Sequence, residues 1–308
     1  MKGTSDERWV GIDIGGTTIK AGAMRGDGTV IEESTIEPGY AKGAAHAMDE
    51  IVREARRLGA TRALGVGVPG QLRRADGFVV DSPNIPSFRA LPLREELAKR
   101  MGFALENVVV ENDANAAALG EQWLGGARGS HDVLMVTLGT GIGGGLILGG
   151  RLYAGAGMAG EVGHVVVDPN GLACGCGGRG CVETLASATA ARRRAIAVNL
   201  PASAPGDLKL LAARARAGEG AERQLLFEIG RDLGRGLGPV ICLLDLETFV
   251  FGGGFSGALD TLEAGIRVGA DERSYGGRGA KLRLLSARLG PSAGWIGAAR
   301  PTVPGQRI

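Results

Sequence analysis

Three of the four cysteines of this chain lie within eight residues of one another, and a histidine precedes them. His164 is followed by Cys174, Cys176 and Cys181, and glycines occupy most of the positions between the cysteines. Three thiolates and one imidazole suit tetrahedral Zn²⁺, and four protein ligands leave no open coordination position. We therefore predict a structural zinc site, with free buried cysteines as the alternative. Cys242 lies far away in an apolar run and is predicted to be core.

Two turns rich in glycine and threonine each follow an apolar run and could bind phosphate. They are residues 13–20 (Asp-Ile-Gly-Gly-Thr-Thr-Ile-Lys) and residues 137–145 (Thr-Leu-Gly-Thr-Gly-Ile-Gly-Gly-Gly). Backbone N–H groups in such turns can cradle phosphate oxygens, and Asp13 can hold a hydrated Mg²⁺ that faces them. One such turn in a hairpin is usually structural, but two at equivalent places predict a clamp for a triphosphate.

A third glycine run, residues 252–254, follows another apolar stretch and could admit an adenine or a ribose against its backbone. None of the three runs fits the P-loop pattern Gly-x-x-x-x-Gly-Lys-Ser/Thr. None fits the dinucleotide pattern Gly-x-Gly-x-x-Gly with an acid about twenty residues later. The predicted nucleotide contacts in the three runs are Asp13, Gly15, Gly16, Thr17, Thr18, Lys20, Thr140, Gly141, Gly253 and Gly254.

Asp113, in the sequence Glu-Asn-Asp at residues 111–113, is a further candidate for chemistry. It follows an expected strand and precedes an alanine-rich, expected helix. Phosphoryl transfer to an alcohol needs alignment, charge neutralisation and a base that accepts the hydroxyl proton. A carboxylate at this place could be that base, but an acid at a helix start is explained equally well as an N-cap. The residues by themselves leave both roles open.

Strands and helices must position these side chains. The strands predicted from apolar runs are 9–14, 19–24, 29–35, 63–68 and 108–110. The helices predicted from apolar residues at helical spacing are 44–58, 93–101 and 114–124. Strands at 133–138 and 146–148 then repeat the order of apolar strand, glycine-rich turn and apolar strand. We interpret this as a weak internal repeat of two α/β halves that face each other.

The second half contains a long predicted helix, residues 221–239, with a glycine at every fourth position of one face. Gly230, Gly234 and Gly238 each cost this helix on the order of 1 kcal/mol relative to alanine, so close backbone packing is expected to compensate. That packing is either inside the domain or at a subunit interface. The remaining predictions are helical structure within 184–219, a strand at 248–251 and a helix at 293–299.

Composition and charge exclude several classes of protein. The chain has 308 residues, of which 44% are hydrophobic and 22% charged, so it can bury a core. Its net charge of +2 gives no electrostatic footprint for nucleic acid or a membrane surface, and aromatic residues are only 4%. No apolar run approaches the roughly 18–20 residues of a membrane span, and the polar start of the chain fits no signal peptide. We expect a cytoplasmic protein.

Together with three further stretches, the glycine runs resemble the sugar kinase/Hsp70/actin fold, and within it the ROK family (repressors, open reading frames and kinases). The stretches are residues 66–70 (Val-Gly-Val-Pro-Gly), residues 111–121 (Glu-Asn-Asp-Ala-Asn-Ala-Ala-Ala-Leu-Gly-Glu) and the His/Cys cluster. The resemblance runs in order from residue 9 to about residue 300 and is strongest to bacterial zinc-containing glucokinases. It implies a two-domain, ribonuclease H-like α/β fold with a cleft between the domains.

The expected elements and the resemblance together predict the domain limits. A small α/β domain covers residues 1–121 and is completed by the C-terminal helix 293–308. A large α/β domain covers residues 122–292 and includes the zinc loop 164–183. Repressors of the family carry an N-terminal helix-turn-helix, which we do not expect here because the first strand is predicted at residue 9. The family favours a homodimer or homotetramer.

The resemblance implies transfer of a phosphoryl group from ATP, with Mg²⁺, to a hexose, and glucose is the expected substrate. Asp113 is then the general base, and structural Zn²⁺ shapes the sugar site. The residues implied to bind sugar are Gly70, Asn84, Asn112, Asp113, Glu161, His164 and Glu183. Asn84 could equally be a turn residue between two prolines, and Glu161 and Glu183 could be surface acids. The alternative functions are a fructokinase, mannokinase or N-acylmannosamine kinase, or a sugar sensor without catalysis.

Overall fold

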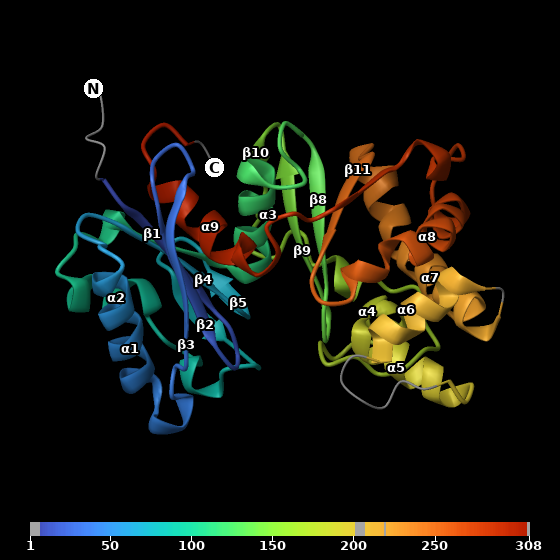
Figure 1. Ribbon diagram of the computed structural model, residues 1–308, viewed down its shortest axis with the longest axis horizontal. Coiled ribbons are helices and arrows are strands. Elements are labelled where there is room, and N and C mark those ends of the chain that lie inside the picture. Colours follow the sequence, from blue (N-terminus) through green and yellow to red (C-terminus); the bar gives the residue numbers. More distant parts are fainter. Residues whose placement is uncertain (1–6, 201–206, 219, 307–308) are drawn as a thin grey trace. The chain divides into compact units, whose positions relative to one another are not determined.

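Two five-stranded sheets with matching strand orders form the framework of the chain in the computed structural model (Figure 1). The first sheet has the order β3-β2-β1-β4-β7, and the second has the order β10-β9-β8-β11-β12. In each sheet the first three strands are neighbours in reverse chain order, and the two later strands follow on the other side of the first. The predicted internal repeat is therefore confirmed by the topology.

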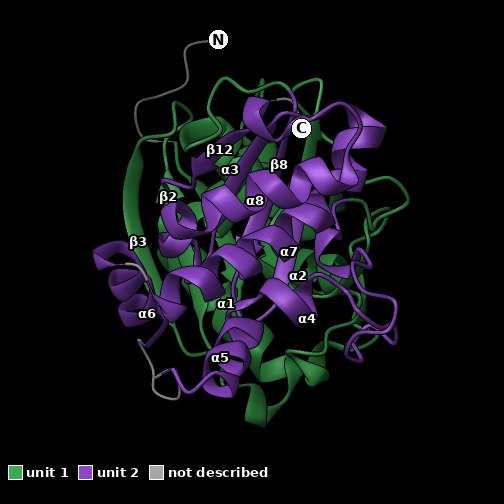
Figure 2. Ribbon diagram, turned by 90° about the vertical axis from the view of Figure 1, so that its right-hand side faces the viewer, with its two compact units in different colours: residues 1–131, 145–159, 289–308 green, residues 132–144, 160–288 purple. Residues whose placement is uncertain are grey.

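The structure describes residues 7–200, 207–218 and 220–306, and its contacts divide the chain into two compact units (Figure 2). Unit 1 comprises Met1–His131, Gly145–Ala159 and Leu289–Ile308, and unit 2 comprises Asp132–Gly144 and Gly160–Arg288. The predicted limits differ from this division, because residues 122–131, 145–159 and 289–292 belong to unit 1. The start of the chain on which the signal-peptide expectation rests (1–6), part of the predicted helical stretch (201–206 and 219) and the C-terminal residues 307–308 lie outside the described residues.

Unit 1 is built on the first sheet. There β1 runs antiparallel to β2 and parallel to β4, and β4 runs parallel to β7. The strands are β1 (Trp9–Ile14), β2 (Ile19–Met24), β3 (Val30–Ile36), β4 (Leu64–Val68) and β7 (Val108–Asn112), with a separate ribbon of β5 (Gln71–Arg73) and β6 (Phe78–Asp81). The helices are α1 (Ala44–Arg57), α2 (Leu93–Met101), α3 (Asp113–Leu124) and α9 (Ala293–Ala299).

Helix α9 joins unit 1 because its backbone packs directly on the first sheet (Figure 1). A Cβ atom on Gly11 of β1 would overlap the carbonyl of Trp295, and one on Gly65 of β4 would overlap the carbonyl of Ala298. The absence of side chains at both positions allows this close approach. Trp295 is 1% exposed and lies in a small core cluster with Met24. The last helix of the chain is thus part of the core that supports β1.

Unit 2 is built on strands of the second sheet and a group of helices. In this sheet β11 runs parallel to both β8 and β12, and β10 pairs antiparallel with β9. The strands of this sheet in unit 2 are β8 (Val133–Leu138), β11 (Thr248–Gly252) and β12 (Arg283–Ser286). The chain passes from unit 2 to unit 1 within β9 (Ile142–Leu148), and β10 (Arg151–Leu152) belongs to unit 1. The helices are α4 (Glu183–Ala186), α5 (Ala188–Ala197), α6 (Asp207–Ala217), α7 (Ala221–Leu244) and α8 (Leu259–Arg273).

The glycine face of α7 packs against α8 inside unit 2 (Figure 2). Added Cβ atoms on Gly230, Gly234 and Gly238 would overlap the backbone or side chains of Leu262, Ile266 and Arg273. Of the two alternatives, packing inside the domain therefore accounts for these glycines. Cys242, near the end of α7, is exposed, so its predicted place in the core is wrong. It lies one residue beyond Ile241, the last buried residue of this helix.

Most predicted elements occur within two residues of their expected limits, but the stretch after β11 differs. No element is predicted between residues 252 and 292, where the structure has α8 and β12. Helix α8 contains Gly265 and Gly269, which weaken helix propensity. Both glycines lie against backbone atoms of α7, so tertiary packing stabilises a helix that local sequence does not indicate.

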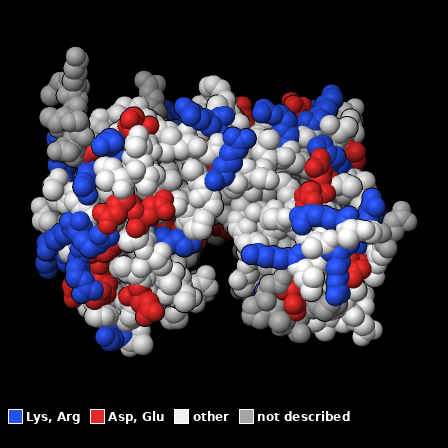
Figure 3. Space-filling model, in the orientation of Figure 1, with Lys and Arg blue, Asp and Glu red and all other residues white. Residues whose placement is uncertain are grey.

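Among the described residues, no helix is long and apolar enough to cross a membrane. The visible face of each unit carries both acidic and basic side chains (Figure 3). This mixture agrees with the small net charge of +2.

Candidate active site and metal centre

The candidate residues of unit 1 lie at the carboxyl ends of three neighbouring parallel strands. Asp13 is near the end of β1, Gly70 lies two residues after the end of β4, and Asn112 ends β7. Asp13 pairs with Gly67, and Gly67 pairs with Glu111. A Cβ atom on Gly67 would lie 3.6 Å from Asp13 Oδ1 and 3.8 Å from Asp113 Cα. The sheet order therefore brings two carboxylates together that are far apart in sequence, as is typical of ligand sites in parallel sheets.

The first glycine turn is held in place by two neighbouring segments. Gly15 N–H donates to the Thr18 carbonyl at 3.0 Å, which closes the turn. The hydroxyl of Tyr40 donates to the Gly15 carbonyl at 2.7 Å. A Cβ atom on Gly16 would lie 3.3 Å from Asn84 Cβ, so the predicted nucleotide turn and a predicted sugar residue are neighbours. Thr17 is exposed, and Lys20 lies opposite Asp13 on β2.

Asn84 and Gly70 occupy tight turns. Ile85 N–H donates to the Ser82 carbonyl at 2.9 Å, which makes exposed Asn84 a turn residue, as the alternative predicted. Gly70 has a φ of 106°, and a Cβ atom there would lie 2.8 Å from Ser82 Cα. A side chain at residue 70 would therefore displace the segment that carries Asn84.

Asn112, and not Asp113, is the N-cap of α3. Its Oδ1 accepts the backbone N–H of Ala114 at 2.9 Å and that of Asn115 at 3.2 Å. Its Nδ2 donates to the Gly70 carbonyl at 3.3 Å. The capping role that the sequence left open for Asp113 thus belongs to its neighbour, and Asp113 is the first residue of the helix.

Burial makes both carboxylates of unit 1 weaker acids than usual. For Asp13, burial and then the charge of Asp113 raise the pKa to about 7, while Lys20 lowers it. For Asp113, burial raises the pKa, and the backbone N–H of Ala114 opposes that change. A carboxylate with a raised pKa is a better proton acceptor than an ordinary aspartate. Two partly buried acids side by side also favour a nearby cation, so Asp13 fits a hydrated Mg²⁺.

Two predicted nucleotide runs of unit 2 follow the neighbouring parallel strands β8 and β11. Gly252 pairs with Thr137 across these strands. The Thr137 hydroxyl accepts Gly143 N–H at 3.1 Å, and Gly139 N–H donates to the Gly141 carbonyl at 3.0 Å. Gly253 has a φ of 86°, and its Cβ would overlap the Leu138 backbone, whereas a Cβ on Gly254 would meet nothing within 4 Å. Backbone geometry thus requires Gly253, and Gly254 leaves open space above it.

The second glycine turn is joined to the segment that follows the cysteine cluster. Glu183 Oε2 accepts Ile142 N–H at 2.8 Å. Ala188 N–H donates to the Gly139 carbonyl at 2.9 Å, and the Thr189 hydroxyl donates to the Thr140 carbonyl at 2.8 Å. A cavity of about 410 Å³ in unit 2 is lined by residues that include Thr140, Glu183 and Thr189. A Cβ atom on Gly141 would overlap the Glu183 carboxylate. A side chain at residue 141 would therefore disturb the predicted nucleotide turn and a predicted sugar residue.

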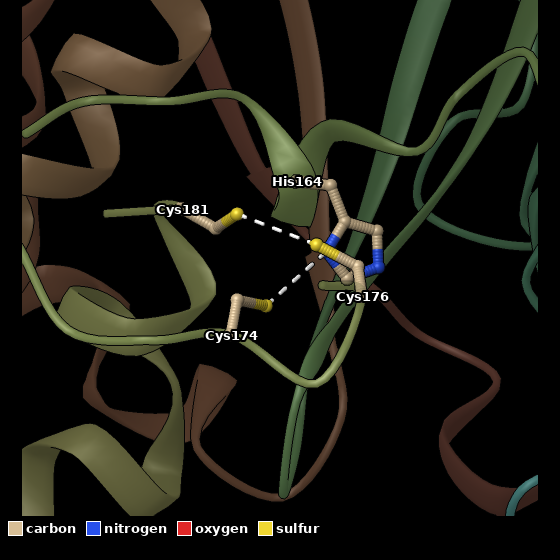
Figure 4. Close-up of side chains that lie close together, drawn as sticks. All are labelled: His164, Cys174, Cys176 and Cys181. Carbon is tan, nitrogen blue, oxygen red and sulfur yellow. Dashed lines mark hydrogen bonds between the residues drawn. The ribbon is translucent and has the colours of Figure 1, made fainter. Parts of the chain in front are cut away.

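The predicted metal ligands come together in unit 2 (Figure 4). The ligand atoms of His164, Cys174, Cys176 and Cys181 all lie within 4.8 Å of one another. Cys174 Sγ is 3.7 Å from His164 Nδ1, and Cys176 Sγ is 3.7 Å from Cys181 Sγ. A Zn–S distance of about 2.3 Å gives a tetrahedron with sulfur–sulfur edges of about 3.8 Å. The four residues therefore fit a structural Zn²⁺.

The surroundings of the cluster also suit a metal. Burial, and then the neighbouring Cys176 and Cys174 thiols, raise the pKa of the Cys181 thiol to about 12. Closely spaced thiolates need a cation, which a zinc ion supplies. His164 directs Nδ1 toward Cys174 and places Nε2 3.9 Å from Glu161 Oε2. Glu183 Oε1 lies 3.9 Å from Cys174 Sγ, so both glutamates are neighbours of predicted metal ligands.

Two supporting residues escaped the sequence analysis. Tyr40 holds the first glycine turn and packs edge-on against Phe88, with ring centroids 5.7 Å apart. Gly294, at the start of α9, faces the Asp13 carboxylate so closely that a Cβ there would overlap it. The glycine pair in Ala-Gly-Trp-Ile-Gly at residues 293–297 was the available signal for Gly294. No local signal pointed to Tyr40.

Comparison with known proteins agrees with this geometry. The ROK family model matches residues 9–301. A glucokinase from Thermotoga maritima is 35% identical over 305 residues, which is 94% of this chain and 95% of that protein. A glucokinase from Streptomyces coelicolor is 36% identical over 307 residues, or 94% of this chain and 96% of that protein.

Solved structures show the same relationship. A ROK family glucokinase from Streptomyces griseus, in complex with glucose and AMPPNP, is 34% identical, with a TM-score of 0.77 over 95% of this chain and 98% of that chain. A ROK hexokinase from Thermus thermophilus is also 34% identical, with a TM-score of 0.79 over 95% of this chain and 97% of that chain. The predicted sugar kinase/Hsp70/actin-like fold class is confirmed, and the chain belongs to the ROK family.

Proposed function

We propose that this protein is an ATP-dependent glucokinase that transfers the γ-phosphoryl group of ATP to the 6-hydroxyl of glucose. The observation that carries the catalytic assignment is the place of Asp113, at the start of α3 and beside Asp13. The similarity to glucokinases over nearly the whole chain favours glucose as the hexose.

In this proposal Asp113 is the general base. Its partly buried carboxylate, whose pKa is raised, accepts the proton of the sugar hydroxyl as the new bond to phosphorus forms. The turn of residues 13–20 and the turn of residues 137–145 present backbone N–H groups to the phosphates. Mg²⁺, when bound, would neutralise phosphate charge. Asp13 would hold the hydrated ion, and Lys20 lies opposite Asp13 on β2.

The residues proposed to contact the sugar are Gly70, Asn84, Asn112, Asp113, Glu161, His164 and Glu183. The Asn112 carboxamide already binds the backbone through Oδ1 and Nδ2, so its second Nδ2 proton is the group left for a sugar hydroxyl. The structural zinc fixes His164, and thereby the direction in which its Nε2–H points.

An assay of ADP release tests both the reaction and the substrate. MgATP is the donor, and glucose, fructose, mannose and N-acetylmannosamine are compared as acceptors. With glucose, the product is identified by its oxidation by glucose 6-phosphate dehydrogenase. We expect the largest kcat/KM for glucose. No ADP release with any hexose, together with measurable sugar binding, would instead support the sensor alternative.

We also propose a cytoplasmic location, where ATP is available and thiols stay reduced, and a homodimer or homotetramer. Size-exclusion chromatography with light scattering measures the oligomeric state. The glycine face of α7 plays no part in this proposal, because α8 covers it.

A further inference from the structure

Glu111 is a buried carboxylate that contacts both the catalytic turn and an arginine from another segment of unit 1. The residue is 2% exposed. Its Oε1 accepts the backbone N–H of Asn112 at 2.9 Å and the Nδ2–H of Asn115 at 2.9 Å. Its Oε2 accepts from Nε and from Nη2 of Arg74, each at 2.7 Å. One carboxylate thus connects Arg74 to two residues of the β7–α3 turn.

Asn112 and Asn115 stand on either side of Asp113 and fix the course of the backbone there. Asn112 caps α3, and Asn115 is 3% exposed with its Oδ1 lacking a hydrogen-bond partner among the described residues. Glu111 is therefore the group that orients the Asn115 side chain. Because Asp113 Oδ1 accepts the N–H of Ala114 in the same turn, a shift of this turn moves the base itself.

Arg74 supplies a positive charge beside the buried Glu111 carboxylate. Its side chain is 35% exposed and forms part of the wall of a cavity of about 340 Å³, which Arg94 and residues Val108, Val109 and Val110 also line. A buried carboxylate that loses its cation is strongly disfavoured. Without Arg74 the Glu111 carboxylate is expected to turn toward solvent, and this movement weakens its two hydrogen bonds to the turn.

We propose that Arg74 and Glu111 are positioning residues that hold Asp113 in its reactive direction. This inference rests on the proposed role of Asp113 as the base. It assigns a catalytic consequence to an ion pair that is not among the residues proposed to bind sugar or nucleotide.

The first test compares Arg74→Ala with Arg73→Ala. Arg73 is the adjacent residue, and its ion pair with Asp76 is exposed on both sides, so it is the matched control. Misplacement of a reacting group lowers the reaction rate by up to about 100-fold. We expect Arg74→Ala to lower kcat roughly 10–100-fold with a small change in the KM for glucose, and Arg73→Ala to keep wild-type kcat. Equal kcat for Arg74→Ala and wild type would overturn the inference.

Chemical rescue separates positioning from general damage to the fold. Removal of the Arg74 side chain enlarges a cavity that already exists, and guanidinium ion is the part of the side chain that Glu111 contacts. We expect guanidinium at concentrations well below denaturing to restore part of the kcat of Arg74→Ala and to leave Arg73→Ala unchanged. Lack of rescue in a folded, glucose-binding variant would count against the inference.

A double-mutant cycle tests whether Arg74 acts through Asp113. In an Asp113→Asn background we expect Arg74→Ala to change the residual kcat less than about threefold, because residues that act as a unit are not additive. If Arg74→Ala lowers kcat by the same factor in the wild-type and the Asp113→Asn backgrounds, the inference is overturned. Wild-type turnover of Asp113→Asn alone would instead overturn the proposed base. Where Arg74→Ala yields no folded protein, Arg74→Gln and Arg74→Lys serve, and the lysine variant is expected to retain more kcat.

Discussion

At the scale of single residues, the site in unit 1 depends on two carboxylates that the sheet holds together against their mutual repulsion. Asp13 has a pKa of about 7, raised first by burial and then by Asp113. Such a pair costs folding free energy at neutral pH, because the unfolded chain releases the proton far more readily. The loss of folding stability accompanies a site that attracts a cation and accepts a proton.

The Asp13→Asn variant measures that cost in the absence of metal and nucleotide. The folded pKa of about 7 lies above the ordinary aspartate value of 3.8, so the contribution of Asp13 to wild-type stability falls as pH rises from about 4 to 7 and then levels off. We expect Asp13→Asn to show a smaller fall, since the pKa of Asp113 is still raised by burial, and to be more stable by roughly 1–4 kcal/mol at pH 8, with little difference near pH 4. The melting temperature of both proteins in EDTA, measured across this range, gives the comparison. Identical pH dependence of the two would show that Asp13 titrates normally.

Asn112 shows why residue roles at a helix start cannot be read from residue type alone. Asparagine and aspartate are both good N-caps, and residues 112 and 113 offer one of each. Which of the two is the N-cap depends on the residue at which the helix begins. Helix α3 begins at Asp113, so Asn112 is the cap. That outcome leaves the Asp113 carboxylate available for chemistry.

At the scale of elements, the glycine runs of unit 2 contain glycines that the backbone requires and glycines that are candidates for ligand contact. Gly253 lies in the left-handed region against the Leu138 backbone. Gly141 faces Glu183, so a substitution there would disturb the predicted sugar residue as well as the phosphate turn. Gly254 borders open space and is the position where a side chain reports on the nucleotide alone.

We expect Gly254→Val to fold and to raise the KM for ATP at least about tenfold, because about 1.4 kcal/mol of lost contact is enough for that factor. The KM for glucose should stay close to wild type. Gly257→Val is the matched control, since a Cβ there also meets nothing within 4 Å. A larger change in the glucose KM than in the ATP KM would mean that the third glycine run does not contact the nucleotide.

The zinc loop also acts on more than its own segment. The sequence separates residues 164–183 from the turn of residues 137–145, which suggests that loss of zinc would affect sugar alone. The structure corrects this expectation, because Glu183 binds Ile142 N–H and the start of α5 binds Gly139. Damage to the loop therefore reaches the phosphate turn.

We expect Cys176→Ala to hold less than the one zinc per chain of the wild type and to lose affinity for both glucose and an ATP analogue, since ligand binding and local folding are coupled. Cys242→Ala is the control, because Cys242 is exposed and lies outside the cluster. Metal analysis and isothermal titration provide the readouts. Fully active, zinc-free wild-type protein would contradict the assignment.

At the scale of the whole molecule, the sequence predicts what is local and periodic. The strands β1, β2 and β8 and the helices α2 and α9 have their expected limits, because each is a continuous apolar run or a clear helical pattern. The four metal ligands were also predictable, since a short loop brings them together. The matching orders of the two sheets extend the repeat of strand, turn and strand that the sequence shows.

The rest depends on contacts between distant parts of the chain. Helix α8 exists because Gly265 and Gly269 fit against α7. The neighbourhood of Asp13 and Asp113 depends on the order β1-β4-β7, and the support of Glu111 by Arg74 depends on the course of the chain after β5. Residue types and local spacing contain none of this information.

The central claim, that Asp113 is the base of an ATP-dependent glucokinase, is tested most directly by the kcat of Asp113→Asn with glucose and MgATP. The variant keeps the size of the side chain and the Ala114 contact of its Oδ1, so we expect it to fold and to bind glucose. A positioned general base contributes about 10²–10⁴-fold, and we expect kcat to fall by that factor. Glucose affinity measured by titration calorimetry should stay near wild type. Wild-type turnover by a folded Asp113→Asn enzyme would contradict the claim.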